Sequence, residues 1–449
     1  MSGCSVYRAE PITSARVEAA LQPRPLEAVR VAASQITHPL LAPLTIDGHD
    51  GFTPEEIAVI SVLANPQLRA LRDRRGVAAA QVIAAGVLPN PQVDASLDQP
   101  RGNNDPTLVT GRTLGLSWDL ASLIGRGPRI DAARQTARSL DLDIAWQEWQ
   151  TAQDARLRAY RVLSLEERLP LARAMESNLE SNVSLIRSAL GRGLTTSTQL
   201  TAAVTAWTQA QSDRLALEQQ LNADRSALRL SLGFPPDAPL TLKATPPPDW
   251  PPKNTTAATL LDGLEQRRLD LVALTVGYQS QEAALRASIR AQFPNIGLNL
   301  NRATDTSDVH TRGYGVTIDL PLFDHQQSAI AAGTATRQQL FDDYVARVAE
   351  ARSEVVQILA NLALVRAQLA SVNESLPALE QQAAALESAY RAHAMDVMTY
   401  RDARGGLETR RIEQSRLRQD VLELMVALEI ATGHSAFSAT TLPATPPGT

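Results

Sequence analysis

Apolar and polar residues alternate one by one in four short segments of the chain. These segments span residues 93–97, 113–120, 296–301 and 314–320. Successive side chains of a strand point to opposite faces of a sheet, so a period of two predicts four β-strands, each with one apolar and one polar face. A polar turn separates the two segments of each pair. The polar faces include Asp94, Asp119, Asn299 and Asp319, and the apolar faces include Trp118 and Tyr314.

Long helical patterns follow each pair of strands. Apolar residues at spacings of three and four predict a helix from Pro128 to Gly191, roughly 95 Å long at ~1.5 Å per residue. After a glycine-containing turn, a second helix returns over residues 197–232 and ends at Gly233. Antiparallel helices joined by a short turn form a hairpin. A shorter helix over about 53–87 precedes the strands, because a Thr-Pro-Glu-Glu start and a proline-rich stop enclose it.

The second half of the chain repeats the first. Asp119 and Asp319, and likewise Gly233 and Gly433, are separated by 200 residues. A helix over 257–292, two strands and a helical hairpin that turns near Ala392 follow in the same order. Self-similarity of this kind indicates a duplicated structural unit. The predicted regions are an extended N-terminal arm over 1–52, a first repeat over 53–233, a proline-rich linker over 234–256, a second repeat over 257–433 and a disordered tail over 434–449.

Composition and charge narrow the classes of function. The chain has 449 residues, of which 44% are hydrophobic but only 4% are aromatic, and this favours closely packed Ala- and Leu-rich helices. A formal net charge of −5 argues against nucleic acid as a partner. No uninterrupted apolar run approaches the ~18–20 residues of a membrane helix. We therefore expect any membrane insertion to occur through strands or lipid.

The only cysteine, Cys4, excludes an intrachain disulfide. Small residues precede it, as at the end of a bacterial lipoprotein signal, although the charged and apolar parts of such a signal are missing. Two interpretations stay open. Cys4 is a lipidation site, or it is an ordinary thiol on a loose terminus.

Strands with one apolar and one polar face are typical of water-filled membrane barrels. Four strands are too few to close a barrel, and open edges in lipid would leave unpaired backbone groups at several kcal/mol each. Several copies would therefore share one barrel, and three copies would supply twelve strands. The helical hairpins would extend from it as a tube. The predicted fold class is mainly α with a small β part; the alternative is a soluble coiled-coil scaffold that carries two β-hairpins.

The twofold repeat, the sequence Asn65-Pro66-Gln67-Leu68-Arg69-Ala70 and the segment 85–91 resemble the TolC-type outer membrane factors. Segment 85–91 is most similar to the heavy-metal-efflux branch. The resemblance implies a homotrimer in the outer membrane, surrounded by its lipid, with a twelve-stranded β-barrel and a periplasmic α-barrel. It implies a passive exit duct for small molecules or metal ions, docked to a periplasmic adaptor protein and an inner-membrane transporter. An exit duct for a secreted protein has the same fold and is the alternative.

The resemblance also implies roles for the two helix turns, around 191–200 and 392–400. These would be the periplasmic tips that contact the adaptor. The residues at the tips are Gly191, Arg192, Gly193, Leu194, Ala392, His393, Ala394, Met395 and Asp396. Tyr390 and Asp402 fall where the family places a gating tyrosine and a pore-lining aspartate, but Met395 occupies the place of the expected arginine. The alternative for Asp402 is a solvated helix charge beside Arg401 or Arg404.

The remaining candidate residues do not form a catalytic or metal-binding pattern. Trp118 and Tyr314 could be membrane-interface aromatics or could pack against a neighbouring strand. The histidines are scattered without ligand spacing, and Asp305, Asp308 and His310 are expected to be a solvated loop and not a metal site. No nucleophile–base pair is present in the pattern. The sequence therefore predicts no enzyme activity, no cofactor and no metal centre.

Overall fold

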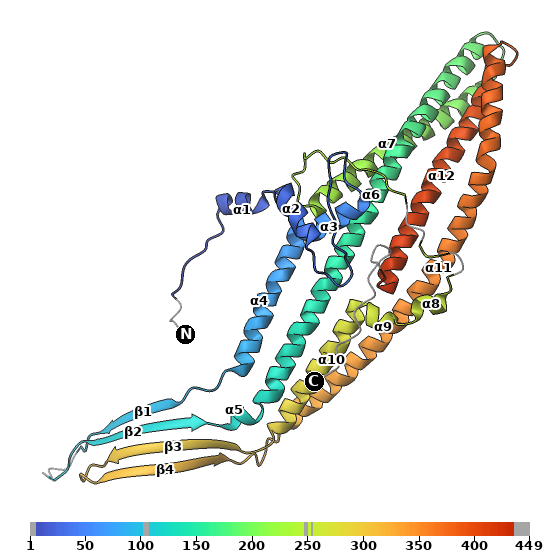
Figure 1. Cartoon of the computed structure of the whole chain (residues 1–449). Helices are drawn as coiled ribbons and strands as arrows, with labels where there is room; N and C mark the ends of the chain where they lie inside the picture. The colour runs from blue at the N-terminus through green and yellow to red at the C-terminus, as the bar shows by residue number, and fades with distance from the viewer. Residues whose placement is uncertain (1–5, 102–106, 247–249, 253–254, 435–449) are drawn as a thin grey trace. The chain divides into compact units, whose positions relative to one another are not determined.

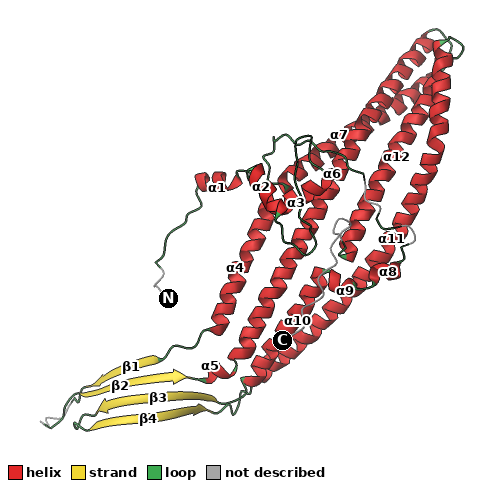
Figure 2. Cartoon of the chain, in the orientation of Figure 1, coloured by secondary structure: helices red, strands yellow, loops and turns green. Residues whose placement is uncertain are grey.

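The computed structural model describes residues 6–101, 107–246, 250–252 and 255–434. Cys4 and the tail after His434 lie outside the described residues, so the predictions for them stay predictions. The chain is mainly helical with one small sheet, as predicted (Figure 2). It divides into two compact units, one of residues 1–70, 145–267 and 351–449 and the other of residues 71–144 and 268–350. Each unit combines segments from both halves of the sequence.

The sheet belongs to the second unit and contains all four predicted strands. They are β1 (Gln92–Asp98), β2 (Gly111–Asp119), β3 (Asn295–Thr304) and β4 (His310–Asp319). All neighbours are antiparallel in the order β1-β2-β3-β4, so β2 and β3 join the two repeats (Figure 1). The strands are longer than predicted at the turn ends. There the alternation continues with polar and basic side chains in place of apolar ones.

Two helical hairpins have the predicted limits. They are formed by α6 (Arg126–Gly191) with α7 (Ser197–Ser231), and by α11 (Gln327–Arg391) with α12 (Val397–Thr432). The return helices start at matching N-caps, Thr196 and Asp396, whose side chains accept hydrogen bonds from backbone N–H groups of the first turn. They end before Gly233 and Gly433, whose φ angles of 64° and 63° are left-handed and favour glycine. The structure thus repeats its caps at the same offset of 200 residues as the sequence.

The helix predicted over 53–87 is two helices, α3 (Pro54–Ala64) and α4 (Pro66–Gly86). Pro66 disfavours the helical conformation at Asn65, which adopts φ −59° and ψ 122°. The Asn65 side chain then caps α4 by accepting from the backbone N–H of Gln67 at 2.8 Å. The helix predicted over 257–292 is likewise broken, into α8 (Ala257–Leu261), α9 (Leu264–Arg267) and α10 (Leu269–Arg290). Gly263, at a φ of 64°, separates α8 from α9.

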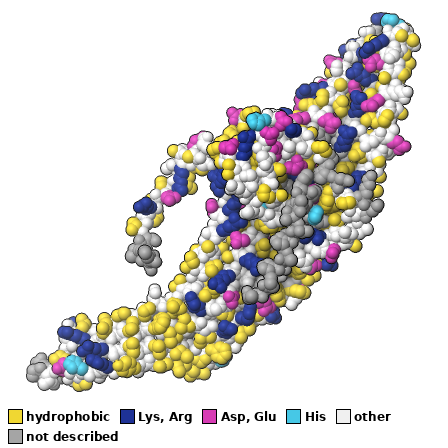
Figure 3. All heavy atoms as spheres, in the orientation of Figure 1, with side chains coloured by type: hydrophobic (Ala, Val, Ile, Leu, Met, Phe, Trp, Pro, Cys, Tyr) yellow, Lys and Arg dark blue, Asp and Glu magenta, His cyan; other side chains and the backbone are white. Residues whose placement is uncertain are grey.

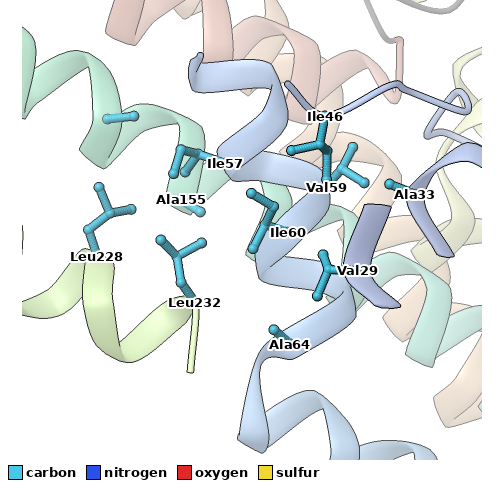
Figure 4. Close-up of a cluster of buried hydrophobic side chains, with 11 residues drawn as sticks. Val29, Ala33, Ile46, Ile57, Val59, Ile60, Ala64, Ala155, Leu228 and Leu232 are labelled. Atoms are coloured by element: carbon cyan, nitrogen blue, oxygen red, sulfur yellow. The ribbon is translucent and has the colours of Figure 1, made fainter. Parts of the chain in front are cut away.

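The prediction of a wholly extended arm was wrong. The arm contains α1 (Ser14–Leu21) and α2 (Leu26–Ser34), and Val29 and Ala33 of α2 are buried. They belong to a core cluster of the first unit that also includes side chains of α3, α6 and α7 (Figure 4). Later in the arm, Phe52 pairs with Leu242 of the proline-rich linker through a parallel β-bridge. Burial of a few apolar residues therefore orders a segment that has no sustained period.

A seam of polar contacts joins α6 to α12 inside the first unit. Its first pair is an ion pair in which the guanidinium of Arg156 donates two hydrogen bonds to Glu429, at 2.8 and 2.9 Å. At the other end of the seam, the two hydrogen bonds between Asn178 and Arg401 are longer, at 3.3 and 3.5 Å. In order along α6, the pairs are Arg156–Glu429, Arg161–Glu423, Arg168–Gln419 and Asn178–Arg401. The seam thus connects the first repeat to the second by hydrogen bonds along most of α12, from Arg401 to Glu429.

One described helix, α11, is long and apolar enough to cross a membrane by length and composition alone. Its best 18-residue window has a mean hydropathy of 1.5, and 17% of that window is buried inside the chain. The sequence prediction concerned uninterrupted apolar runs, whereas this window includes polar residues. A single helix of this kind does not indicate a span, since core helices pass the same test. It does show that much apolar surface on α11 is uncovered in the single chain.

Candidate functional site

The polar face of the sheet gathers the four side chains that the sequence singles out. The register places Asp94 beside Gly115, Asp119 beside Gly297, and Asn299 between Ser117 and Gly315. A Cβ atom at Gly115 would collide with the carboxylate of Asp94, so glycine provides the space over which this side chain lies. The polar face is therefore lined by amides, hydroxyls and carboxylates with small residues between them.

Two of the carboxylates are linked near the helix end of the sheet. The Nδ2 group of Asn295 lies 3.2 Å from Oδ2 of Asp319 and 3.5 Å from Oδ2 of Asp119. Farther along, Asn299 donates to the hydroxyl of Thr317 at 2.6 Å. All four predicted residues thus share one face, and Asn295 brings two of them together. Asn295, the first residue of β3, was not among the predicted residues.

The opposite face of the sheet is apolar and exposed. Leu298, Leu300 and Val316 are 41%, 46% and 62% accessible, respectively, and the exposed apolar surface continues beyond the strands to Phe293 and Phe323. Figure 3 shows apolar side chains spread continuously over the strands. Strands β1 and β4 each have one edge that no described residue pairs. The sheet thus combines a solvated face, an apolar face without cover and two open edges.

Trp118 and Tyr314 lie on the apolar face at different heights. Trp118 is half-buried near the helix end of β2, and its indole N–H donates to the carbonyl oxygen of Pro89 at 2.9 Å. Tyr314 lies opposite Leu300, closer to the turn, and is 82% exposed. The indole of Trp118 thus contacts the segment that precedes β1, whereas the phenol of Tyr314 projects from the sheet. A place for either residue at a membrane interface stays a prediction.

The two helix tips share one backbone design. At the first tip the N–H of Leu194 donates to the carbonyl of Ala189, and at the second the N–H of Ala394 donates to that of Ala389. These bonds of the Schellman type each place one residue in the left-handed region. That residue is Gly193 at the first tip, with a φ of 71°, but His393 at the second, with a φ of 57°. The backbone of the second tip is therefore strained at His393, whereas Gly193 adopts the same conformation without strain.

Tyr390 is partly exposed and stacks on Tyr400 across the second tip. Their ring centroids are 5.0 Å apart and their planes differ by 4°. Arg404 donates to the Tyr400 hydroxyl at 3.3 Å and pairs with Glu408 at 3.1 Å, and these hydrogen bonds raise the pKa of Arg404 above its usual range. The stack joins the last turn of α11 to the first turn of α12. The sequence marked Tyr390, but nothing in the pattern identified Tyr400 as its partner.

Asp402 does not pair with the arginines that the alternative interpretation invoked. Arg404 contacts Tyr400 and Glu408. The guanidinium of Arg401 donates to the backbone carbonyl of Asn178, whose side-chain amide donates to the backbone carbonyl of Arg401. Asp402 instead borders an open groove of about 750 Å³ beside the tips. Arg192 and Leu194 of the first tip also line this groove, as do Leu179 and Met398, which the sequence reading missed.

Asp396 caps α12 at the second tip. Its carboxylate accepts from the backbone N–H groups of Met398 and Thr399 and from the Thr399 hydroxyl, at 2.9, 3.0 and 2.6 Å. The Thr399 hydrogen bonds hold the pKa of Asp396 below its usual range. The remaining tip residues, Gly191, Ala392 and Met395, lie in or next to the two turns. The structure therefore places all nine predicted tip residues in the two helix turns.

Known proteins resemble this chain in sequence pattern and in fold. The sequence model of a family described as outer membrane efflux protein matches residues 61–234 and 260–434. No curated protein sequence matches. Solved structures with the same fold include CusC, at 18% identity and a TM-score of 0.67 over 89% of this chain and 98% of that one. They also include the open state of the Neisseria gonorrhoeae MtrE outer membrane channel, at 16% identity and a TM-score of 0.68 over 88% and 92%. VceC from Vibrio cholerae matches at 15% identity and a TM-score of 0.65 over 85% and 96%.

Proposed function

Because the chain belongs to the outer membrane efflux protein family, we propose that three copies of it form the exit duct of a tripartite efflux system. The observation that carries the proposal is the sheet, with its apolar face exposed, its polar face opposite and both edges open. Such a sheet is stable in a membrane only if other strands complete it. The soluble scaffold, which was the alternative, is wrong because the family is one of outer membrane proteins.

Three copies fit the sheet and the helices. Twelve strands fall within the range of known membrane barrels, whereas four do not. In that arrangement β1 of each copy would pair with β4 of the next, so no edge would stay open. Exposed apolar side chains of α11, which include Phe341, Val345 and Leu364, would meet a neighbouring copy in the helical tube. The helical part would lie in the periplasm.

The polar face would line the passage. Each copy contributes Asp94, Asp119 and Asp319, so the wall would be rich in carboxylates and would favour cations over anions. Transport along this polar wall would be passive diffusion. The cargo would be small molecules or metal ions, and the likeness of segment 85–91 to the heavy-metal branch stays a prediction. A duct for a secreted protein would use the same wall.

The tips would dock the periplasmic adaptor, which in turn contacts the inner-membrane transporter. Three Asp402 carboxylates around the axis would repel one another and attract cations at the entrance. The stack of Tyr390 on Tyr400 would hold the second tip in its closed form. Opening would then require that this stack separate or move with the hairpin.

Two neighbouring residues of β3 test the proposal directly. Leu298 belongs to the apolar face and Asn299 to the polar face, so an arginine at each position probes lipid or lumen with the same side chain. We expect Leu298→Arg to reduce the amount of protein in outer membranes, because arginine near the midplane costs about 2–4 kcal/mol. Asn299→Arg should insert normally and shift the reversal potential of the purified channel away from cation selectivity.

The controls are the mass of the wild type in detergent and its need for detergent. A trimer that inserts into bilayers and conducts supports the proposal. A monomer that stays soluble without detergent would refute it, as would the reverse pattern in which Asn299→Arg blocks insertion and Leu298→Arg does not.

A further inference from the structure

Three arginines interrupt the apolar face of the sheet at its turn end. By alternation, Arg112 of β2, Arg302 of β3 and Arg312 of β4 share this face with Leu114, Leu300 and Tyr314. All three arginines are exposed. Figure 3 shows basic side chains gathered at this end of the sheet, next to the apolar surface. We call Arg112, Arg302 and Arg312 the basic rim.

Carboxylates of the described residues do not pair with the basic rim. No ion pair within that part of the chain reaches any of its three guanidinium groups. Asp98 belongs to the opposite face, and the carboxylate of Asp305 accepts hydrogen bonds from the backbone N–H groups of Ser307 and Val309, at 2.8 and 3.0 Å. The rim therefore presents positive charge that nothing described on the chain neutralises.

The register makes this arrangement unfavourable by itself. Arg302 and Arg312 are directly opposite each other on neighbouring strands. Like charges in that position destabilise a sheet, whereas an anion between them would convert the repulsion into two charge-assisted contacts. Guanidinium groups suit phosphate in particular, because their parallel N–H groups match two phosphate oxygens.

We propose that the basic rim binds the phosphate groups of anionic lipids in the outer leaflet of the membrane. The inference rests on the proposed function, because the apolar face must lie in lipid for the rim to meet headgroups. The turn end of the strands is opposite the helices, and the helices are periplasmic, so the rim lies at the external surface. A free anion would not need the neighbouring apolar face, but a phospholipid or phosphoglycolipid uses both.

The shape of the boundary supports a lipid ligand. On β3 and β4 the change from apolar to basic occurs between Leu300 and Arg302 and between Tyr314 and Arg312. On β2 the change lies between Leu114 and Arg112. Because the register pairs Leu114 with Arg302, this is two residues closer to the turn than on β3. A flat membrane surface that crosses tilted strands would produce such a step, since barrel strands tilt by about 35–45°.

The test measures lipid binding to the purified trimer by native mass spectrometry. The probes are diphosphorylated lipid A and the same lipid without its phosphates, each added in neutral detergent. A basic residue near an anionic headgroup contributes about a fivefold change in affinity, so removing three should weaken binding on the order of 100-fold. We expect that loss in the variant Arg112→Gln/Arg302→Gln/Arg312→Gln, with the phosphorylated lipid only. Added salt should weaken wild-type binding in the same way.

A matched control changes the same number of charges elsewhere. Arg74, Arg138 and Arg187 are exposed arginines of α4 and α6, and their replacement by glutamine should leave lipid binding unchanged. Equal loss in both triple variants would refute the proposal, because net charge alone would explain it. Equal binding of the two lipids, or full displacement by millimolar inorganic phosphate, would also refute it.

A second readout separates binding from folding. Without lipid, Arg302→Gln should unfold at the same temperature as the wild type or higher, because it removes the repulsion with Arg312. With phosphorylated lipid, the wild type should gain more stability than the variant. If the wild type neither inserts nor conducts, the proposed function fails first. If it inserts and conducts without preferring the phosphorylated lipid, only the basic rim proposal fails.

Discussion

The buried ion pair between Arg156 and Glu429 offers the sharpest test of how the two repeats hold together. The side chain of Glu429 is fully buried and that of Arg156 is 3% exposed, so neither reaches solvent. Burial alone would lower the pKa of Arg156, but the hydrogen bonds and charge of Glu429 raise it instead. The arginine also lies 5.7 Å from the ring centroid of Tyr160 and 4.0 Å from Glu55. Arg156 therefore carries its positive charge in the core, and the carboxylate of Glu429 provides most of the interactions that offset the cost of burying that charge.

We expect Glu429→Gln to destabilise the protein by about 3–5 kcal/mol, because it leaves a buried guanidinium without its carboxylate. The lower end is expected, since glutamine can still accept one hydrogen bond and Glu55 is near. Arg156→Met should cost a similar amount by stranding Glu429. The double variant should cost clearly less than the sum of the two, because neither charge is then left alone.

The assay is urea unfolding in detergent, followed by helical circular dichroism. Protein concentration must stay fixed, because the stability of an oligomer depends on it. Arg411 and Glu380 provide the control. They form a salt bridge of 2.8 Å between α12 and α11 with side chains that are 43% and 44% exposed. Glu380→Gln should change the free energy of unfolding by no more than about 1 kcal/mol.

Two results would refute the reasoning. The first is a cost for Glu429→Gln no larger than that for Glu380→Gln. The second is strict additivity of the two core variants, which would mean that Arg156 and Glu429 do not depend on each other.

Three further predictions concern the helix tips. His393→Gly should slow hydrogen exchange at the second tip and stabilise it by about 1 kcal/mol, because left-handed backbone is costly for any residue with a Cβ, whereas Gly193→Ala should weaken the first tip by a similar amount. Tyr390→Ala should raise the open probability of the purified channel in bilayer recordings and Tyr390→Phe should not, because only the first removes the stacked ring; equal behaviour of both would count against the stack. The lowered pKa of Asp396 means that its cap stabilises the fold above the unfolded-state value of about 3.9 and that this contribution is lost as pH falls through the folded-state value. Exchange at the start of α12, corrected for its intrinsic rate, should therefore accelerate in acid for the wild type and stay unchanged for Asp396→Asn.

Regular patterns made most of the architecture predictable. A period of two identified the strands, and apolar residues at spacings of three and four identified the long helices. The polar face follows from alternation alone, so Asp94 and Asn299 were found without a structure. The turn-end extensions were missed because the sequence reading expected apolar residues on the lipid-facing side. Arg302 and Arg312 continue the alternation, but they place charged side chains on the face that is otherwise apolar.

Contacts between distant segments could not be predicted in the same way. Arg156 and Glu429 come from different repeats, and each alone resembles an ordinary charged residue on a helix. The partner of Tyr390 depends on the path of the turn, since ten residues separate it from Tyr400. Short helices such as α2 have too few turns to show a period, and burial against the core decides their conformation.

The polar seam between α6 and α12 has a mechanical consequence. Apolar ridges that interlock resist sliding, because any shift opens voids, whereas hydrogen-bonded pairs near solvent can exchange partners with water. The seam starts at a fully enclosed ion pair and ends in contacts of 3.3 and 3.5 Å between Asn178 and Arg401. Its compliance therefore rises toward the tips. A force applied at the tips would therefore move the tip ends of α6 and α12 relative to each other and leave the helices in place at the Arg156–Glu429 ion pair.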